Sequence, residues 1–348
     1  MKEQHKRRVR YKGTHPRNFQ EKYKELNPQK YSETVNRVIS KGNTPAGMHR
    51  SIMVHEILDV LNIQSGEQGL DCTLGYGGHT LEMLKLLGHS GKMYALDIDT
   101  IEMQKTRVRL SEKGYGEEDI TILHQNFANI DLVAQQAGKF DFVLADLGVS
   151  SMQIDNPERG FSYKLDGPLD LRLNPEQDLT AAQRLLEITK DEFEGMLQEN
   201  ADEPYAEQIA ETVMNAIRKG QPVDTTTKLR QLIEQAFLKI RIENKEEAVK
   251  KSCQRTFQAL RIDINSEYEV LETFLEKLPG ILKPGGRAAI LTFHSGEDRL
   301  VKRAFREGKR TGIYSDISAE AIRPSMEECR ANSRAHSTKL RWSIRSSE

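Results

Sequence analysis

The sequence predicts an α/β fold: a doubly wound, mostly parallel sheet with a helical subdomain inserted into it. Short apolar runs of strand length alternate with helical patterns from about residue 50 to residue 146, and the alternation resumes near residue 254. Between these stretches, residues 160–250 show helical patterning without obvious strands. Strands that alternate with helices in this way are typical of parallel sheets with helices on both faces.

The first half of the chain carries the clearest alternation. A helix is expected where Met53, Ile57 and Leu61 recur at helical spacing. The expected elements, in order, are a helix over 53–61, a strand over 69–73 that runs into a glycine-rich loop, a helix over 81–87, a strand over 93–96, a helix over 100–113, and strands over 121–123 and 140–145.

The second half adds helices and then returns to strands. Thr180 with Gln183, and Thr189 with Glu192, have the spacing of capping boxes. The other expected elements are a helix from about 203 to Gly220, a helix from a cap at Thr226 through 238, a helix over 271–278, a tight turn over 284–286, a strand over 288–293, and an edge or final strand over 340–345.

Composition narrows the class of protein. The chain has 348 residues, 37% of them hydrophobic, and no apolar run approaches the ~20 residues that a membrane helix needs. Its charged N-terminus lacks the apolar core of a secretion signal. Cys72, Cys253 and Cys329 lie far apart, which argues against a disulfide framework and a zinc site. We therefore expect a cytoplasmic protein with no membrane contact and no metal.

The first 45 residues are strongly basic, although the net charge of the whole chain is −1. They hold twelve Lys or Arg against four Glu, an excess of eight, with aromatic residues interleaved. Such an arm could neutralise phosphates and stack on bases of a nucleic acid. The alternative is a solvated tail.

A glycine-rich loop, DCTLGYGGHT, follows the first expected strand. Gly75, Gly77 and Gly78 would let the backbone approach a ligand closely, because no side chain stands in the way. Asp97, 22 residues beyond Gly75, would accept hydrogen bonds from ribose hydroxyls. Thr80 stands where a dinucleotide fingerprint needs a third glycine, so that fingerprint fails.

Asp71 opens this loop, and a carboxylate there suits a nucleoside cofactor that is cationic at its amino-acid end, as S-adenosylmethionine is. The alternative is an ordinary glycine-rich turn between a strand and a helix.

Two acidic residues downstream are candidate catalytic groups. Asp146 ends the buried strand, where ligands bind in open α/β sheets, and Asp170 lies in the later segment GPLDLR. Methylation of an exocyclic amine needs such an acceptor, because a hydrogen bond from the N–H makes the delocalised lone pair more nucleophilic and the carboxylate can take the proton. The alternatives are a helix cap for Asp146 and a turn residue for Asp170.

Four residues near the resumed α/β pattern are candidate substrate contacts. Arg255 and Arg261 could hold phosphates, Phe257 could stack on a base, and His294 could orient that base. Alternatively, Phe257 belongs to the core, the arginines are solvated, and His294 is only hydrogen-bonded within the core.

Taken together, these segments resemble the bacterial small-subunit ribosomal RNA cytosine-N4 methyltransferases. The matching segments between about His49 and Arg345 are, in order, DCTLGYGGHT, DLGVSS with PERGFS, PLDLRL, RTFQALR, PGGR, FHSGEDRLVKR and SRAHSTKLR. The resemblance implies a class I, Rossmann-like methyltransferase fold and S-adenosylmethionine as methyl donor. It also implies a cytosine N4 amine in ribosomal RNA, naked or within the small subunit, as the target.

The resemblance further implies a set of donor-binding residues and a division into domains. The residues are Gly77, Gly78, His79, Asp97, Phe127, Asp146 and Gln153, with Phe127 beside the adenine. The domains are a basic extension over 1–45, a methyltransferase domain over 46–158 and 251–348, and an inserted helical substrate-recognition subdomain over 159–250.

Some positions depart from the family pattern and leave alternatives open. Gly296 stands where Leu is usual, Met152 where Pro is usual, and the segments 200–203 and 251–254 also differ. These departures leave open a paralogue that methylates a different RNA site. A non-catalytic RNA-binding assembly factor is the alternative from another class, whereas Asp146-Leu147-Gly148 disfavours a DNA amino-methyltransferase.

Overall fold

The structure is a computed structural model that describes residues 51–177 and 179–347. The basic extension predicted over 1–45 therefore lies outside the described residues. Within the described chain, no helix combines the length and the apolar character needed to cross a bilayer.

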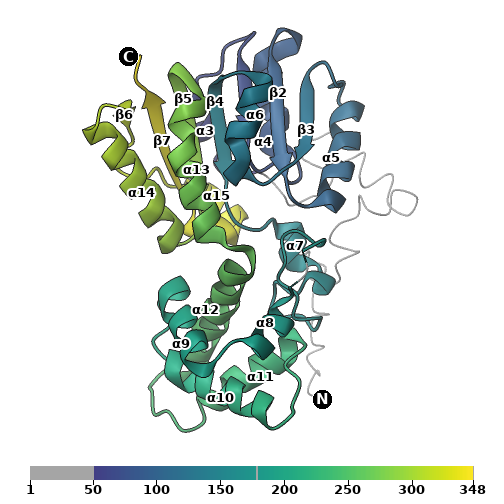
Figure 1. Cartoon of the computed structure of the whole chain (residues 1–348), viewed down its shortest axis with the longest axis vertical. Helices are drawn as coiled ribbons and strands as arrows, with labels where there is room; N and C mark the ends of the chain where they lie inside the picture. The colour runs from purple at the N-terminus through teal and green to yellow at the C-terminus, as the bar shows by residue number, and fades with distance from the viewer. Residues whose placement is uncertain (1–50, 178, 348) are drawn as a thin grey trace, which may run out of the picture. The chain divides into compact units, whose positions relative to one another are not determined.

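A seven-stranded sheet lies at the centre of the part that the structure describes (Figure 1). Its strands, in spatial order, are β3 (Ile120–His124), β2 (Lys92–Asp97), β1 (Gln68–Asp71), β4 (Phe140–Asp146), β5 (Leu282–Thr292), β7 (Lys339–Arg345) and β6 (Tyr314–Ile317). The first five run parallel, whereas β7 is antiparallel to β5 and β6. The predicted mostly parallel sheet is confirmed, and the carboxyl ends of β2, β1 and β4 are side by side.

Helices cover both faces of the sheet, as expected of a doubly wound fold. Alternate residues of β4 point to opposite faces: Val143 joins the core on one face, and Phe142 and Leu144 join the core on the other. One core includes α6 (Ile130–Ala137), α13 (Glu267–Ile281) and α14 (Ser295–Arg310); the other includes α3 (Val54–Leu61), α4 (Gly78–Leu87) and α5 (Thr100–Glu112).

Most of the chain between β4 and β5 packs around a third core, the helical core, to which loop residues such as Phe161 and Leu171 also contribute. It is formed by α8 (Ala181–Glu187), α9 (Lys190–Ala201), α10 (Ala206–Arg218), α11 (Thr226–Ala236) and α12 (Lys245–Asn265). Both predicted capping boxes are present, at Thr180 and at Thr189. α12 runs across residue 250, and its buried Cys253, Phe257, Leu260 and Ile264 belong to the helical core. The predicted domain boundaries stay a prediction.

Short helices also connect the main elements. They are α7 (Ser151–Asp155), α15 (Met326–Ala331), and the 3-10 helices η2 (Gly88–Ser90), η3 (Phe127–Asn129), η4 (Pro157–Arg159) and η5 (Ser333–Ser337).

The predicted turn over 284–286 and the predicted bounds of α11 differ from the structure, whereas the last predicted strand is confirmed as the final one. Residues 284–286 lie within β5. Leu282 pairs with Phe140 and Arg287 pairs with Phe142, so β5 has more residues between its two pairs than β4 has. The extra residues form an irregularity in the strand instead of a turn. β7 is the final strand but not the edge, because the short β6 pairs with its outer side. α11 is capped by Thr225, not Thr226, and ends at Ala236, two residues early.

Candidate active site

The sheet order brings three acidic residues to one edge. Asp71, Asp97 and Asp146 end β1, β2 and β4, which are neighbours in the sheet. In open parallel sheets this edge, outside the carboxyl ends of the strands, is where ligands bind. The first two candidate groups from the sequence, the glycine loop and Asp146, therefore meet at one place.

The glycine loop packs tightly against α5. A Cβ atom on Gly77 would lie 2.6 Å from Cγ2 of Thr106, and Gly77 has φ 79°, which favours glycine. The Thr106 hydroxyl donates a hydrogen bond of 2.6 Å to the Gly75 carbonyl. Gly77 also precedes α4 without any side-chain cap, so the first amides of α4 are left for an anionic ligand group.

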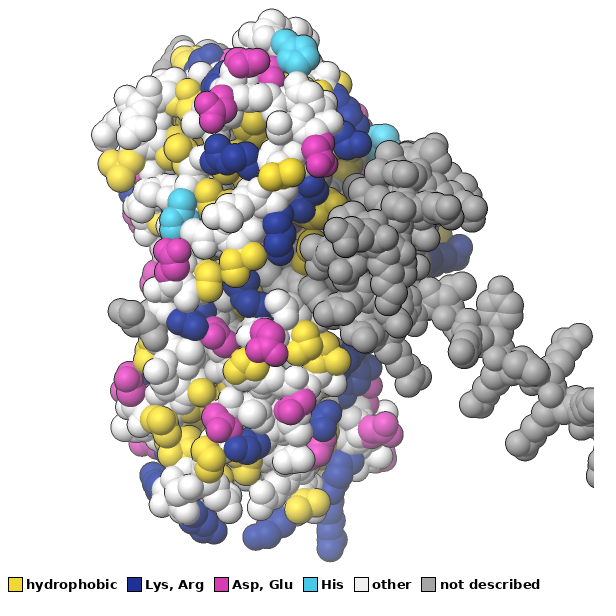
Figure 2. Space-filling model, turned by 90° about the vertical axis from the view of Figure 1, so that its right-hand side faces the viewer, with side chains coloured by type: hydrophobic (Ala, Val, Ile, Leu, Met, Phe, Trp, Pro, Cys, Tyr) yellow, Lys and Arg dark blue, Asp and Glu magenta, His cyan; other side chains and the backbone are white. Residues whose placement is uncertain are grey.

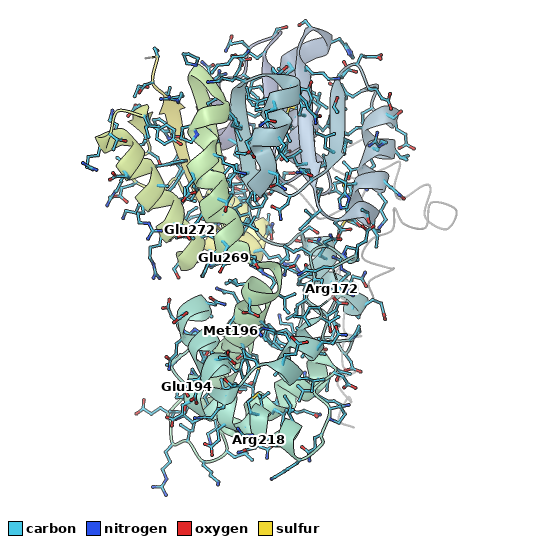
Figure 3. All side chains as sticks on the ribbon, viewed as in Figure 1. Arg172, Glu194, Met196, Arg218, Glu269 and Glu272 are labelled. Atoms are coloured by element: carbon cyan, nitrogen blue, oxygen red, sulfur yellow. The ribbon has the colours of Figure 1, made fainter. Side chains whose placement is uncertain are left out.

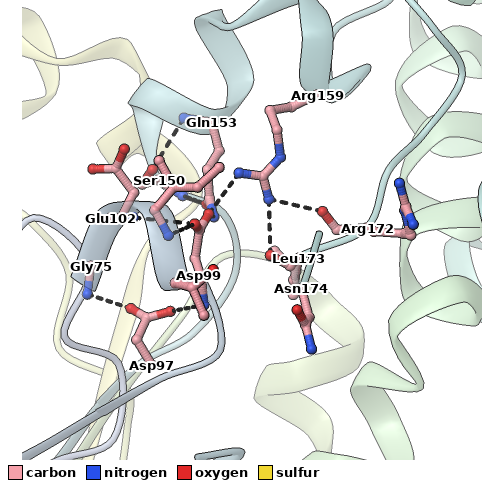
Figure 4. Close-up of polar contacts among 12 residues, drawn as sticks. Gly75, Asp97, Asp99, Glu102, Ser150, Gln153, Arg159, Arg172, Leu173 and Asn174 are labelled. Atoms are coloured by element: carbon pink, nitrogen blue, oxygen red, sulfur yellow. Dashed lines mark hydrogen bonds and ion pairs between the residues drawn. The ribbon is translucent and has the colours of Figure 1, made fainter. Parts of the chain in front are cut away.

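Asp97 is held by the backbone on both sides (Figure 4). Its Oδ2 accepts a hydrogen bond of 2.7 Å from the Gly75 amide, and its Oδ1 accepts one of 2.9 Å from the Asp99 amide. Burial raises the pKa of Asp97 from 3.8 to about 6, although these two amides lower it in part. The carboxylate is thus fixed in direction while each oxygen keeps a further lone pair for a ribose hydroxyl.

Asp71 accepts hydrogen bonds that hold the glycine loop in place. Thr80 donates a hydrogen bond of 2.6 Å to one of its oxygens and the Thr73 amide one of 3.0 Å to the other. Asp71 is buried, and burial raises its pKa above the usual value. Its position below the loop explains why a carboxylate precedes the glycines. Whether it also attracts the cationic end of a ligand stays a prediction.

Asp146 and His79 face each other across the site. His79 Nε2 lies 3.5 Å from Asp146 Oδ2, and His79 is only 8% exposed. Burial by itself would lower the pKa of His79, but the Asp146 carboxylate raises it above its usual value. His79 Nε2 and Asp146 Oδ1 are buried atoms that lack a hydrogen-bond partner in the described chain. Orphaned polar atoms of this kind mark a place where a ligand is expected to bind.

Two further residues expected to bind the donor lie around the same edge. Phe127 begins η3, shortly after β3. Its ring packs edge-on against the Phe274 ring, with 5.4 Å between the ring centroids. Gln153 lies on α7, where it forms a capping box with Ser150. Its side-chain Nε2 donates a hydrogen bond of 2.9 Å to Asp99 Oδ2. The set expected from the resemblance is therefore compatible with one binding site at this edge, and its role in binding stays a prediction.

The reasoning from sequence missed Asp99 and Arg159. Asp99 caps α5 and is 1% exposed, and Arg159 Nη1 donates to its Oδ2 at 2.6 Å. Asp99 with Glu102 has the spacing of a helix start, so the sequence signalled a cap and nothing more. Arg159 lies in the segment PERGFS, and no local pattern in the sequence indicates its ion pair.

Asp170 is engaged by its own loop. Both of its oxygens accept hydrogen bonds from Arg172, at 2.8 and 2.7 Å. Arg172 lies between the sheet and the helical core (Figure 3). No hydrogen bond or ion pair within the described residues joins Asp170 to Asp146 or His79. The structure thus gives Asp170 a local partner, and a catalytic role for it stays a prediction.

The four expected substrate contacts have separate surroundings. Phe257 is 4% exposed and packs in the helical core, the alternative noted from the sequence. Arg261 forms a two-pronged ion pair with Glu267 at 2.7 and 2.9 Å. Arg255 is 37% exposed and lies 3.9 Å from Glu203. Of the four, Arg255 offers the most accessible charge.

His294 caps α14 and forms part of a small polar cluster. Its Nε2 lies 3.1 Å from Glu297, which is itself buried. Ligand atoms of Glu267, His294 and Glu297 lie within 4.8 Å of one another, a spacing that could suit a metal ion. Arg261 already neutralises Glu267, however, so we assign no metal to this cluster.

A parallel sheet of this kind, a glycine loop before a helix that no side chain caps within the described residues, and an acid at the end of β2 define an S-adenosylmethionine-dependent methyltransferase of the Rossmann-like class. Residues 46–346 match the model of the MraW methylase family. The chain belongs to this family.

Curated relatives agree with this assignment. The chain is 63% identical over 341 residues to "Ribosomal RNA small subunit methyltransferase H 1" of Lachnoclostridium phytofermentans, covering 98% of this chain and 93% of the relative. It is 62% identical over 342 residues to the protein of the same name from Agathobacter rectalis, covering 98% of both. "Ribosomal RNA small subunit methyltransferase H" of Clostridium botulinum is 37% identical over 311 residues, covering 84% of this chain and 97% of the relative.

Proposed function

We propose that this protein transfers a methyl group from S-adenosylmethionine to the exocyclic N4 amine of a cytosine in small-subunit ribosomal RNA. The observation that carries the proposal is the buried Asp146 Oδ1, which lacks a partner in the described chain at the edge formed by β1, β2 and β4. The names of the relatives support ribosomal RNA as the substrate class. We place the reaction in the cytoplasm, where small subunits are assembled.

The residues at the sheet edge fit the donor. Asp97 would hold the ribose hydroxyls, Phe127 would lie against the adenine, and Gln153 would line the pocket. The uncapped amides at the start of α4 would bind the donor's own carboxylate. The donor supplies a methyl group that is activated by its bond to a positively charged sulfur.

Asp146 would activate the attacking nitrogen. Its free Oδ1 accepts a hydrogen bond from the cytosine N–H, which opposes delocalisation of the nitrogen lone pair into the ring. When the new N–C bond has formed, the same carboxylate can take the surplus proton. The Asp146 amide donates a hydrogen bond of 2.7 Å to the Thr73 hydroxyl, and His79 lies beside Oδ2, so the acid is held in place.

The remaining parts of the chain would bind RNA. We propose that the region over 159–250 recognises the substrate and that the basic extension over 1–45 adds contacts to phosphates. The relatives that cover 98% of this chain must share most of that extension. This shared coverage supports a role for the extension in the proposed function.

The direct test is a reaction with purified components. Small ribosomal subunits from cells that lack this protein are incubated with the protein and a methyl-labelled donor, and the RNA is digested to nucleosides. We expect label in N4-methylcytidine by mass spectrometry, and none with Asp146→Asn. Label in 5-methylcytidine or in another base would overturn the proposal.

A second candidate is methylation of a different RNA site. Gly296, which stands where the family usually has Leu, leaves space that Tyr268 fills: a Cβ atom there would lie 2.0 Å from the Tyr268 hydroxyl. This packing differs from the family pattern near the helical core and would suit altered specificity. Mapping the labelled nucleotide in the same reaction separates the two candidates.

A further inference from the structure

Arg159 connects the donor side of the molecule to a loop next to the helical core. Its Nη1 donates to Asp99 Oδ2 at 2.6 Å, and its Nη2 donates to the carbonyls of Arg172 and Leu173 at 3.0 and 2.9 Å (Figure 4). The Arg159 side chain is 13% exposed. A planar guanidinium can hold both sides at once, which a lysine amine cannot do in the same geometry.

On the donor side, Asp99 touches two residues expected to bind the donor. Its amide donates to Asp97 Oδ1 at 2.9 Å, and its Oδ2 accepts from Gln153 at 2.9 Å. The other oxygen, Oδ1, caps α5. A ligand that fixes Asp97 and Gln153 would therefore also fix the carboxylate to which Arg159 is bound.

On the other side, the loop over 171–173 is clamped between Arg159 and α12. The Asn265 side chain of α12 donates to the Leu171 carbonyl at 2.8 Å and accepts from the Leu173 amide at 2.7 Å. The Leu171 amide donates to the Arg159 carbonyl at 3.2 Å. Leu171 has φ 64°, an unfavourable conformation for leucine that persists only where the surroundings enforce it.

The simplest alternative is a purely structural ion pair. A buried pair must first recover the cost of removing both charges from water, so it is weak evidence of a stabilising role. Here the pair lies where the donor pocket meets a strained loop that α12 also holds. This position would suit coupling between the donor side and the region over 159–250 that we propose recognises RNA.

We propose that Arg159 is a positioning residue that makes donor binding and RNA binding depend on each other. When the donor occupies the pocket, Asp97, Asp99 and Arg159 hold the loop in the shape that binds RNA; without the donor, the loop is held less firmly. The coupling is reciprocal, so bound RNA also strengthens donor binding. This inference rests on the proposed function.

The test measures RNA affinity with and without S-adenosylhomocysteine, which lacks the transferable methyl group. The probe is a small ribosomal subunit from cells lacking the protein, labelled with fluorescein at the RNA 3′ end and followed by anisotropy. For the wild type we expect binding at least about 5-fold tighter with the ligand, the lower end of usual coupling factors. For Arg159→Ala we expect a ratio of the RNA affinities with and without the ligand that is near one.

Conservative variants separate coupling from folding. Asp99→Asn keeps an oxygen to cap α5 but loses the charge that Arg159 binds, so its ratio should also fall toward one. Arg159→Lys keeps the charge but cannot hold both sides in this geometry, so its ratio should also fall toward one. The matched control is Arg287→Ala, which breaks a 2.7 Å pair with Glu67 near the amino end of β1, at the other end of the strands from the donor side and outside the region over 159–250. It should keep the wild-type ratio even if it lowers the melting temperature.

The outcomes distinguish this inference from the proposed function. Two outcomes would overturn the coupling alone. In the first, the wild-type protein binds both ligands but its RNA affinity is the same with and without S-adenosylhomocysteine. In the second, the Arg159→Ala or Asp99→Asn variant keeps the wild-type ratio of these affinities. A folded wild-type protein that does not bind S-adenosylhomocysteine, measured by calorimetry, or does not bind the subunit, overturns the proposed function and the coupling with it.

Discussion

Asp146 keeps its Oδ1 buried and without a partner in the described chain, which is costly unless a substrate group binds there. Asp146→Asn preserves the shape of the side chain but removes the acceptor that can take a proton. We expect turnover to fall at least about 100-fold, the usual scale for a lost acid–base group, while donor affinity changes little. Single-turnover kinetics and calorimetry measure the two quantities. Turnover within a few-fold of wild type would remove Asp146 from the chemistry.

Asp97 predicts a pH dependence of donor binding. Burial raises its pKa to about 6, and the ionised form is the better acceptor for ribose hydroxyls. As the pH falls through 6, protonation competes with the donor, so affinity should be flat above about 7 and weaken by about tenfold per pH unit well below 6. Calorimetry from pH 8 to pH 5 measures this. An Asp97→Asn variant, which has no proton to exchange, should lack the step; a step that persists in it belongs to another group.

At the scale of single residues, the sequence was enough to predict the glycines and acids at the strand ends, but not the ion pairs. Gly75, Gly77, Asp97 and Asp146 follow strands that are recognisable as apolar runs, so their convergence at one edge could be inferred. The pair between Asp99 and Arg159 joins residues 60 positions apart, and no local pattern signals it. Periodicity did hold a clue to the burial of Phe257, because Phe257, Leu260 and Ile264 share one helical face.

The contact between α13 and α14 depends on a glycine. Tyr268 near the start of α13 packs on Gly296 and donates a hydrogen bond of 3.1 Å to the Asn200 carbonyl at the end of α9. Gly296→Leu should expel the ring and cost about 1–3 kcal/mol of stability, the usual cost of overpacking. Denaturant unfolding measures it.

The double variant is the control for this contact. Tyr268→Ala removes the ring, so Gly296→Leu should cost less in that background than alone. Additive losses in the double-mutant cycle would show that the two positions do not compete for space.

Among the elements, long and regular ones were predictable and short or irregular ones were not. The parallel strands β1 to β4 and the caps at Thr180 and Thr189 have strong local signals. β6 has four residues, two of them polar and exposed, and its pairing with β7 depends on distant chain. The glycines at 285 and 286 indicated a turn, but they form an irregularity within β5 that has no partner residues in β4.

At the scale of the whole molecule, charge is divided unequally. The whole chain has a net charge of −1, and the first 45 residues carry an excess of eight positive charges, so the remainder is acidic. On the face shown in Figure 2, basic side chains are interspersed with acidic ones. The described part alone therefore lacks the overall charge that attracts a polyanion.

Deleting residues 1–40 should consequently weaken RNA binding and flatten its salt dependence. Each phosphate contact that is lost should reduce the slope of log K against log salt by about 0.7 to 0.9. Anisotropy titrations at several salt concentrations measure the slope, with calorimetry of S-adenosylhomocysteine as the control that the pocket is intact. An unchanged slope would show that the arm does not contact phosphates.

The most direct measurement is a crystal structure with S-adenosylhomocysteine. We predict its ribose hydroxyls within about 2.7–3.2 Å of the Asp97 carboxylate, its own carboxylate at the amides that open α4, and its sulfur directed toward Asp146. A nucleoside bound away from the ends of β1, β2 and β4 would contradict the account.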